Sequence, residues 1–132
     1  MTVNVSWYDE EQTIILQEFP MNWTWEDFFE AVGRTVELEK TVSHPVYILG
    51  TNPKNGQMPK GNSLAQFNAA LKMHPPHMRY YILATNNTFV ALMGRVLLQT
   101  SGLREKTRLV NTVDDGLRLI ADDKVKSGQQ VN

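Results

Sequence analysis

The chain has 132 residues and a formal net charge of −1, with 42% hydrophobic residues, 20% charged residues and no cysteine. This length and composition predict one globular domain with an apolar core. They exclude a disulfide framework, a thiolate metal site and a cysteine nucleophile, and the scattered Lys and Arg residues argue against nucleic-acid binding, which needs a clustered basic surface.

Neither a targeting segment nor a membrane span is predicted. Residues 1–7 lack the basic region before an apolar core that marks a signal peptide. No apolar run approaches the roughly 18 residues that a membrane-spanning helix needs. We therefore expect a cytoplasmic protein without stable membrane insertion, which is compatible with the lack of cysteine.

Two strands and a helix are predicted in the first third of the chain. Val3, Val5 and Trp7 alternate with polar residues, which is typical of a half-buried strand. Thr13–Leu16 follows a short polar turn as the second strand of a hairpin. Thr24 is the expected N-cap of a helix, because an acidic residue stands three positions later. The apolar residues at helical spacing after it are Trp25, Phe28, Phe29, Val32 and Val36.

Two buried strands flank a second helix in the middle of the chain. Val46–Leu49 and Tyr80–Ala84 are short continuous apolar runs, which favour strands covered on both faces. Between them, Ser63 and Gln66 form a capping box that predicts a helix start. Pro75-Pro76 cannot continue that helix.

The last third of the chain predicts a helix, a strand and a final helix. Asn86–Thr88 supplies cap candidates for a helix over Phe89–Leu98. Thr107–Val110 is the last predicted strand, and Thr112 is the expected N-cap of the final helix. The polar tail, residues 126–132, is predicted to be disordered.

The predicted order is β-β-α-β-α-β-α-β-α within a single α/β domain over residues 1–125. Strands separated by single helices favour parallel neighbours with right-handed crossovers. We therefore expect Val46–Leu49 and Tyr80–Ala84 to be adjacent and parallel. The first strand, joined to the second by a tight turn, should be antiparallel to it and lie at an edge. The result is a mixed, mostly parallel sheet with an antiparallel edge strand.

Three stretches resemble the STAS family, the fold of bacterial anti-sigma-factor antagonists, and most closely its divergent STAS-like branch. The resemblance extends over residues 3–124 and implies a regulatory protein-interaction module without catalysis or cofactor, which binds a protein partner or forms a homodimer. The stretches are Trp23–Phe29, Tyr47–Gly50 with Leu64–Phe67, and Tyr80–Phe89 with Arg108–Val110 and Thr112–Asp115.

The sequence departs from the family where the third strand leads into the next helix. Members that act in phosphorylation switches carry Asp-Ser or Asp-Thr there, followed by a small residue and Gly. Here Met58–Ser63 contains no acidic residue, and Ser63 alone supplies a hydroxyl near the helix start. Ser63 is therefore either a helix cap or a candidate phosphosite at a helix N-terminus.

The same loop also resembles a phosphate-binding loop. Gly56–Ser63 is close to G-x-x-x-x-G-K-S, but Asn62 replaces the Lys that reaches the outer phosphates, and Pro59 lacks an amide donor. We therefore predict no nucleotidase activity. The alternative to a protein-interaction module is a small-ligand or anion-binding domain, catalytic or not, that uses the Thr51–Ser63 loop. The backbone amides expected to bind the anion belong to Lys60, Gly61, Asn62 and Ser63.

Other candidate sites are weaker. His74 and His77 could suggest a metal site, but two imidazoles without a third ligand do not complete a metal shell, and we expect solvated loop histidines and no metal. No Ser/His/Asp set can be assembled from the sequence, so no catalytic residue is predicted.

The helix over Phe89–Leu98 is more apolar than a one-sided helix requires. Its core stripe leaves Val90 and Leu98 as surplus apolar area. Three readings remain open: a deeply packed helix, a protein or dimer interface, and a lipid-facing patch. The interaction face predicted for the second reading consists of Val90, Met93, Leu97 and Leu98.

Overall fold

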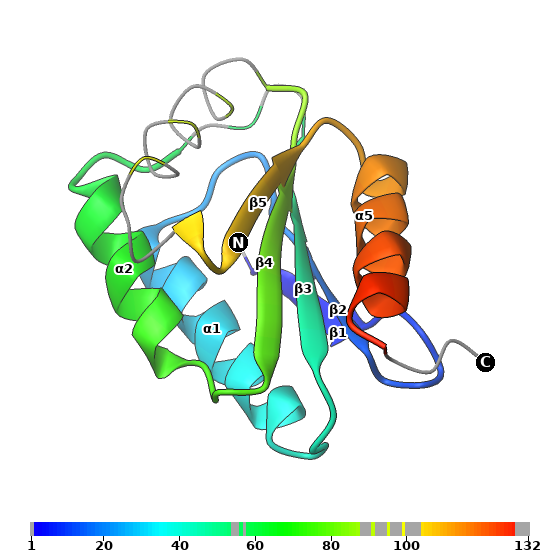
Figure 1. The fold of residues 1–132 in the computed structure, drawn as a ribbon. Helices are drawn as coiled ribbons and strands as arrows, with labels where there is room; N and C mark the ends of the chain where they lie inside the picture. The colour runs from blue at the N-terminus through cyan, green and yellow to red at the C-terminus, as the bar shows by residue number, and fades with distance from the viewer. Residues whose placement is uncertain are drawn as a thin grey trace.

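The computed structural model describes residues 2–53, 56, 58–87, 91, 95, 99 and 104–128. Within these residues, five strands form one mixed sheet between two layers of helices (Figure 1). The strands are β1 (Asn4–Trp7), β2 (Ile14–Glu18), β3 (Val46–Thr51), β4 (Met78–Ala84) and β5 (Thr107–Val110). The helices with full bounds are α1 (Trp25–Glu39), α2 (Ser63–Met73) and α5 (Val113–Lys126).

The order of the strands across the sheet is β1-β2-β3-β4-β5. β1 runs antiparallel to β2, and every other neighbouring pair is parallel. The predicted mixed sheet, its antiparallel hairpin and the parallel pairing of β3 with β4 are therefore confirmed. Each strand is added beside the previous one, so the order never reverses within the sheet.

The central strand β3 explains why the sheet has helices on both faces. Val46, Tyr47, Ile48 and Leu49 are all 0% exposed, so successive side chains are buried on opposite faces. A strand that is buried in this way needs a helical layer above and below it. The continuous apolar run in the sequence thus determines the layered architecture.

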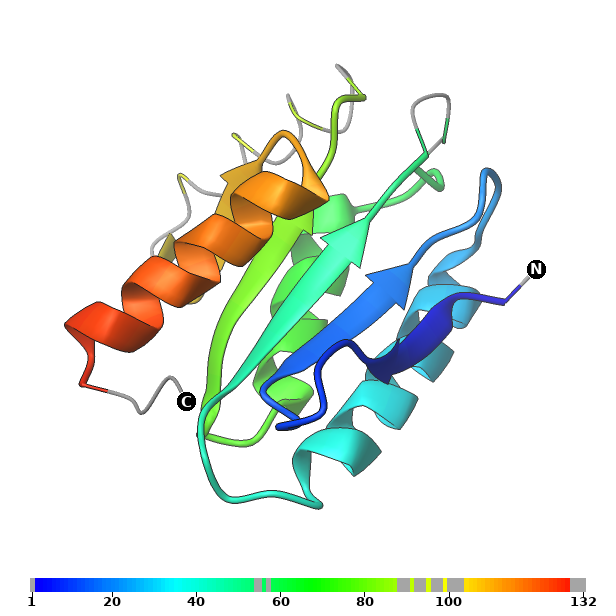
Figure 2. The same ribbon diagram turned by 90° about the vertical axis from the view of Figure 1, so that its right-hand side faces the viewer.

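Two hydrophobic clusters fill the space between the layers (Figure 2). The first lies between the sheet and the α1–α2 layer, and the second lies under α5. The buried residues of the first are Val3, Phe19, Trp23, Phe28, Ala31, Val32, Val36 and Ala70. Those of the second are Ile14, Tyr47, Leu49, Ile82, Ala84 and Ile120.

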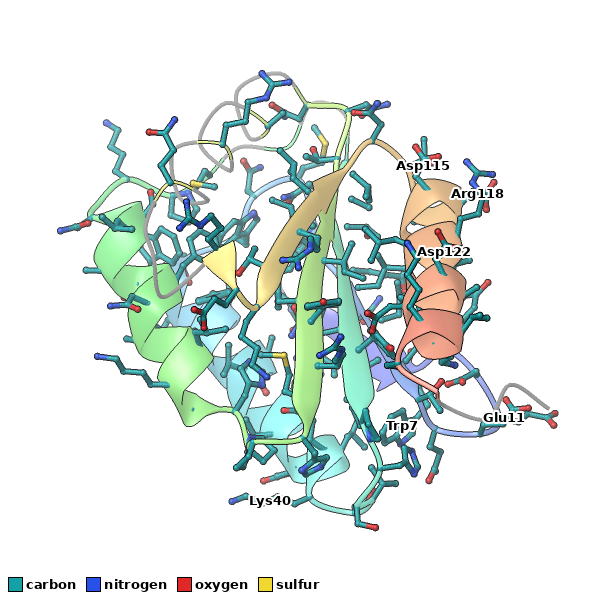
Figure 3. The ribbon with its side chains drawn as sticks, viewed as in Figure 1. Trp7, Glu11, Lys40, Asp115, Arg118 and Asp122 are labelled. Carbon is teal, nitrogen blue, oxygen red and sulfur yellow. The ribbon has the colours of Figure 1, made fainter. Side chains whose placement is uncertain are left out.

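The caps predicted for α1 and α5 are present. The amide of Asp27 donates to Thr24 Oγ1 at 3.0 Å, and the amide of Thr24 donates back to Asp27 Oδ2 at 2.9 Å. At α5, the amide of Asp115 donates to Thr112 Oγ1 at 3.0 Å. Asp115 also pairs with Arg118 at the start of this outer helix (Figure 3). These local bonds satisfy amides that the helix itself leaves without partners.

A buried polar network lies beneath α1. Gln17 is 0% exposed, and its Nε2 donates to Thr35 Oγ1 at 2.8 Å. Its Oε1 accepts a bond of 3.0 Å from the hydroxyl of Tyr81, which reaches it across β3. Gly50 makes this possible, because a Cβ there would lie 2.8 Å from Tyr81 Oη. Each buried group therefore has a partner, as burial in an apolar layer requires.

A second polar network ties the end of α5 to the sheet. β4 carries a bulge, because Val46 pairs with Met78 while Tyr47 pairs with Tyr80. The extra residue, Arg79, bonds to Asp123 of α5 through Nε at 2.8 Å and Nη2 at 2.9 Å. The hydroxyl of Tyr47 donates to the same carboxylate at 2.6 Å. The bulge thus redirects Arg79 toward α5, a recurrent use of such irregularities.

Two predicted segments fall wholly or partly outside the described residues. Of the helix predicted over Phe89–Leu98, Ala91 and Arg95 are described and helical. The predicted tail overlaps α5 at Lys126, where the hydrogen bonds of the last turn still hold the chain. Residues 129–132 lie outside the described part.

We predict that Gly50→Ala lowers the free energy of unfolding by about 1–3 kcal/mol, because the added methyl displaces the Tyr81 ring from Gln17. Gly33→Ala is the matched control: it lies inside α1 with nothing within 4 Å of its added Cβ. That change should stabilise the protein by about 0.5–1 kcal/mol. Urea unfolding of both variants measures these free energies. Equal changes in the two variants would contradict the packing of Tyr81 against Gly50.

We also predict that Asp123 contributes stability that is lost in acid. The hydrogen bond from Arg79 holds the pKa of Asp123 below its usual value of 3.8, with a further contribution from Tyr47. A lowered pKa in the folded state stabilises the protein above the unfolded pKa, and this stability is lost as the pH falls through the folded one. Asp123→Asn should therefore lower the midpoint of urea unfolding at pH 7. The gap to the wild type should begin to narrow below about pH 4 and should close as the pH falls through the folded pKa. A gap that stays constant as the pH falls through this range would refute the assignment.

Candidate functional site

The carboxyl edge of the parallel strands is the first place to look for a site. α1 follows β2 and α2 follows β3, so both helices begin at this edge, where the β2 and β3 arrowheads point in Figure 2. In open α/β sheets this edge usually holds the ligand, most often where the strand order reverses. The order here does not reverse, so any site must be formed by the connecting loops.

The loop before α2 is held by Trp25. The indole Nε1 of Trp25 donates to the carbonyl oxygen of Lys60 at 2.9 Å. Gly61 follows with φ of +127°, and a Cβ there would lie 3.2 Å from the same Nε1. Glycine is suited to this position because it adopts positive φ without strain and lets the indole approach the backbone. The loop conformation is thus fixed from within the protein.

The start of α2 differs from the prediction at one residue. Asn62, not Ser63, is the N-cap, and its Oδ1 accepts from the amide of Ala65 at 3.1 Å. Ser63 is the first residue of the helix, only 7% exposed, with its hydroxyl 3.5 Å from Met58 Sδ. Both are strong cap formers and they are adjacent, so the sequence could not separate them. A phosphoryl group on Ser63 would first require Met58 to move.

The four residues predicted to bind an anion lie in one turn, and some of their polar groups already have partners within the protein. The amide of Ser63 donates to the carbonyl of Gly61 at 3.1 Å, so it is already used. The carbonyl of Lys60 faces Trp25, and the side chain of Asn62 caps the helix. Several polar groups of this turn are therefore already used in hydrogen bonds that hold its own conformation.

The loops after β3 and β4 are linked as well. Asn87 Nδ2 donates to the carbonyl of Gly56 at 2.6 Å, and its amide donates to Thr85 Oγ1 at 3.0 Å. Thr85 is 2% exposed, and its own amide donates to the carbonyl of Val110 at 3.0 Å. Hydrogen bonds therefore run along this edge from β5 to the β3 loop.

A shallow hollow of about 180 Å³ opens between the β2–α1 and β3–α2 connections. Its lining residues are Asn22, Trp23, Met58, Pro59 and Lys60. Trp23 is 7% exposed, and its indole Nε1 is buried without a hydrogen-bond partner in the described part of the chain. A buried donor without a partner is costly and rare, and it marks this hollow as unusual.

Two exposed apolar side chains lie near the lining residues in the sequence. Met21, 45% exposed, directly precedes Asn22 of the lining. Leu64, 41% exposed, follows Ser63, whose hydroxyl contacts Met58 of the lining. Behind the hollow, Trp23 packs edge-on against Trp25 with ring centroids 5.3 Å apart. The lining is therefore mixed, with the polar Asn22 and the cation of Lys60 next to the apolar Met58 and Pro59.

The hollow offers few groups for catalysis. Among the lining residues that the structure describes, Lys60 is the one titratable group, and none of them carries a carboxylate, an imidazole or a hydroxyl. A general acid–base pair or an activated nucleophile needs at least two such groups within hydrogen-bonding reach. Across the described residues, no group of three or more His, Cys, Asp or Glu could hold a metal ion. The same part of the chain contains no helix long and apolar enough to cross a membrane.

The expectation of solvated loop histidines is wrong for His74. Its side chain is 3% exposed, and its Nδ1 lies 2.6 Å from Oε1 of Glu39. His77 is half-buried, and its Nε2 donates to the main-chain oxygen of the same Glu39 at 2.7 Å. The partner lies more than thirty residues earlier in the chain, so the local sequence could not reveal this contact.

Sequence reasoning also missed the hollow. Trp23 contributed only to the family resemblance, and the segment Phe19–Trp23 was not considered as a binding surface. The available signal was an apolar and polar mixture, Pro20-Met21-Asn22-Trp23, placed between a strand and a helix cap. The predicted interaction face, Val90, Met93, Leu97 and Leu98, lies outside the described residues and stays a prediction.

Comparisons with known proteins provide no relative for this site. Neither a protein-family model, nor a curated protein, nor a solved structure matches the chain. The function must therefore be argued from the site itself.

We predict that Trp25→Phe keeps the fold but releases the Lys60 loop. Phenylalanine retains ring packing against Phe28 and Phe67 but lacks the donor for the Lys60 carbonyl. The loss should be about 0.5–1.5 kcal/mol in unfolding free energy. Amide hydrogen exchange should accelerate at residues 60–65 and not in β3. Unchanged exchange in the loop would show that the indole does not hold it.

Proposed function

We propose that this chain is a non-catalytic regulatory or protein-interaction module of STAS-like type that acts in the cytoplasm by binding a protein partner or a second copy of itself. The observation that supports this best is the hollow at the carboxyl edge. It combines an unpartnered buried indole N–H with exposed Met21 and Leu64.

The size of the hollow favours a protein side chain over a free small molecule. Pockets that enclose drug-sized ligands measure roughly 300–1,000 Å³. The hollow here measures about 180 Å³, which is closer to the size of one anchoring side chain.

The residue types around the hollow favour protein contacts. Tryptophan dominates interface hot spots, and methionine adapts to different partner surfaces. Met58 lines the hollow and Met21 directly precedes its lining residue Asn22, while Trp23 lines it with a largely buried ring. The described lining residues include no acid–base pair, which supports the proposal of binding without catalysis.

The STAS-like assignment rests on the order of the elements. An antiparallel edge hairpin precedes parallel strands joined by helices, as the resemblance implies. The family's acidic phosphorylation motif is missing, and Ser63 is buried, so we propose binding that does not depend on phosphorylation of Ser63. The lack of cysteine in the chain agrees with the proposed cytoplasmic location.

A second candidate is the binding of a small anion or carboxylate in the Thr51–Ser63 loop. One observation favours it: Lys60, which belongs to this loop, places a cation in the lining of the hollow. Titration calorimetry with phosphate and with acetate tests this candidate directly. Heat that disappears in Lys60→Met would support it over the protein-interaction module.

We predict that Met21→Glu with Leu64→Glu abolishes association and leaves the fold intact. Both side chains are more than 40% exposed, so a charge there costs little in the free protein. In an interface the same charges lose water without gaining a partner, and the apparent affinity should fall at least about tenfold. Sedimentation measures self-association, and quantitative capture from the native cell measures partner binding.

Val125→Glu is the matched control, because Val125 is 69% exposed and lies in the last turn of α5, at the opposite edge of the sheet. It should bind like the wild type. Val90→Glu tests the predicted face outside the described residues. Equal binding by the wild type and the double variant would contradict the proposed surface. Loss of binding in Val90→Glu alone would indicate that the helix predicted over Phe89–Leu98 binds the partner instead.

A further inference from the structure

The side of the sheet that ends in β1, here called the β1 edge, is open. β1 is the first strand in the order, and in the described part of the chain it pairs with β2 alone. Figure 2 shows it at the border of the sheet, alongside α1. Asn4 and Ser6 are exposed, while Val5 and Trp7 are half-buried. A border strand presents main-chain N–H and C=O groups to which another strand can pair.

The main-chain groups of Val5 and Trp7 point away from β2. In an antiparallel pair, residues that exchange hydrogen bonds with the partner strand alternate with residues whose main-chain groups point outward. The amide of Tyr8 donates to the carbonyl of Ile14 at 2.7 Å, so Tyr8 belongs to the bonded set. Counting back along β1 in the same register places Ser6 in this set and leaves Val5 and Trp7 outside it.

Two further contacts agree with this alternation. On β2, the amide of Phe19 donates to a carbonyl of β3 at 3.0 Å, so the odd-numbered residues of β2 face β3 and not β1. On β1, the carbonyl of Val3 accepts a hydrogen bond from Arg34 Nη2 of α1. The outward acceptor of Val3 is therefore used, whereas the described residues provide no partner for the outward groups of Val5 and Trp7.

β1 has little protection against pairing with another strand. Asn4–Trp7 contains no charged residue and no proline, and its register with β2 has no bulge. Its protection is limited to its short length and to Arg34 on the Val3 carbonyl. The two outward residues offer one N–H and one C=O each to an added strand. Because main-chain bonds do not distinguish sequences, the surrounding side chains must select the partner.

The part of the chain that contains β1 is strongly acidic. Residues 1–39, which include β1, β2 and α1, contain nine acidic residues and one basic residue. Residues 40–132 contain five acidic and twelve basic residues. The net charge of −1 is therefore the sum of two large and opposite charges. A surface of one sign attracts segments of the opposite sign and accelerates their encounter.

Acidic side chains lie at one end of β1 and on the helix beside it. Glu10 and Glu11 are exposed in the turn after β1, and Glu11 is labelled in Figure 3. Glu30 and Glu37 are exposed on α1, one turn to either side of Arg34, and so share the helix face that contacts β1. Arg34 is bound by Glu30 at 2.6 and 2.8 Å, which compensates its charge.

We propose that the β1 edge binds an extended, basic segment of a protein partner as an added strand. The outward main-chain groups of Val5 and Trp7 pair with the segment, and the acidic side chains around β1 select lysine and arginine in it. A second copy of this chain is a poorer occupant, because its own β1 would bring the same acidic surface. None of the residues that line the hollow belongs to β1, so this surface is additional to the proposed function.

Selection of short random peptides displayed on phage tests the chemistry of the partner. The wild-type protein is the bait, and the peptides that bind β1 should be rich in lysine and arginine and in β-branched residues. Binding of the strongest basic peptide is then measured by calorimetry at low and high salt. Its affinity should fall as salt screens the attraction. A selection without a basic bias would overturn the proposal.

A proline at position 5 tests the main-chain contact. Val5→Pro removes the outward N–H and leaves the bonds to β2 in place, because proline is tolerated where the N–H faces solvent. Val5→Ala retains the N–H and is the matched control. The Kd for the selected peptide should be about two- to tenfold higher in Val5→Pro than in Val5→Ala. Equal values in two folded variants would contradict strand addition.

Removing acidic charge tests the selectivity, and it does not depend on the folding of Val5→Pro. Glu11→Gln with Glu37→Gln removes two exposed charges and should raise the Kd about two- to fivefold at low salt. Asp114→Asn with Asp122→Asn is the matched control, because both residues are exposed on α5; Asp122 is labelled in Figure 3. The control should bind like the wild type, and an equal loss in both double variants would contradict selection at β1.

Amide hydrogen exchange of the wild type locates the bound peptide directly. Saturation with the selected peptide should slow exchange at Val5 and Trp7, whose amides point outward in the free protein. The amide of Ser6 faces β2 in the same register and should change less. Unchanged exchange at Val5 and Trp7 in the bound protein would overturn the proposal, even if the selected peptides are basic.

Discussion

The complete burial of β3 on both faces is the constraint on which the rest of the structure depends. Four successive residues, Val46 to Leu49, are fully excluded from water, so the strand must lie inside the sheet and under helices on both sides. Its neighbours β2 and β4 are then parallel to it, because each is joined to it through a helix. The loops that follow parallel strands therefore lie at one common edge of the sheet.

That common edge has two opposite properties. Its loops are held from inside, by the indole of Trp25 on the Lys60 carbonyl and by Asn87 on the Gly56 carbonyl. At the same place Trp23 keeps a donor without a partner, beside exposed apolar side chains. A preordered backbone loses little entropy on binding, which suits the proposed recognition surface.

At the other edge of the sheet, contacts between polar side chains connect the layers. Glu39 contacts His74 on the α1–α2 side, and Asp123 pairs with Arg79 on the α5 side. His77 and Arg79 are separated by one residue at the start of β4, so the two contacts share one short segment. The contact to α1 and the contact to α5 are therefore joined by residues 77–79 of the chain.

Local pattern was sufficient for much of the fold. The alternation of Val3, Val5 and Trp7, the apolar run of β3 and the caps at Thr24 and Thr112 are readable within a few residues, and all appear in the structure. The choice of Asn62 over Ser63 as a cap depends on tertiary fit, since Met58 packs on the Ser63 hydroxyl.

Features of the two edges could not be read in this way. The bulge at Arg79 follows from pairing with β3 and with Asp123, more than forty residues later. His74 is buried because of Glu39, and the hollow depends on two loops that meet only after folding. A few neighbouring residues are enough to predict the strands and caps. They do not reveal which distant residue an isolated polar side chain will contact.

Site-specific photo-crosslinking tests the central claim, that the carboxyl edge binds a protein, most directly. A photoreactive residue in place of Leu64 lies beside the hollow, and one in place of Val125 lies at the far edge; both positions are exposed. In the cells that normally make this protein, the account predicts a discrete crosslinked protein product from position 64 and none from position 125. No product at position 64, or the same product from both positions, would contradict it.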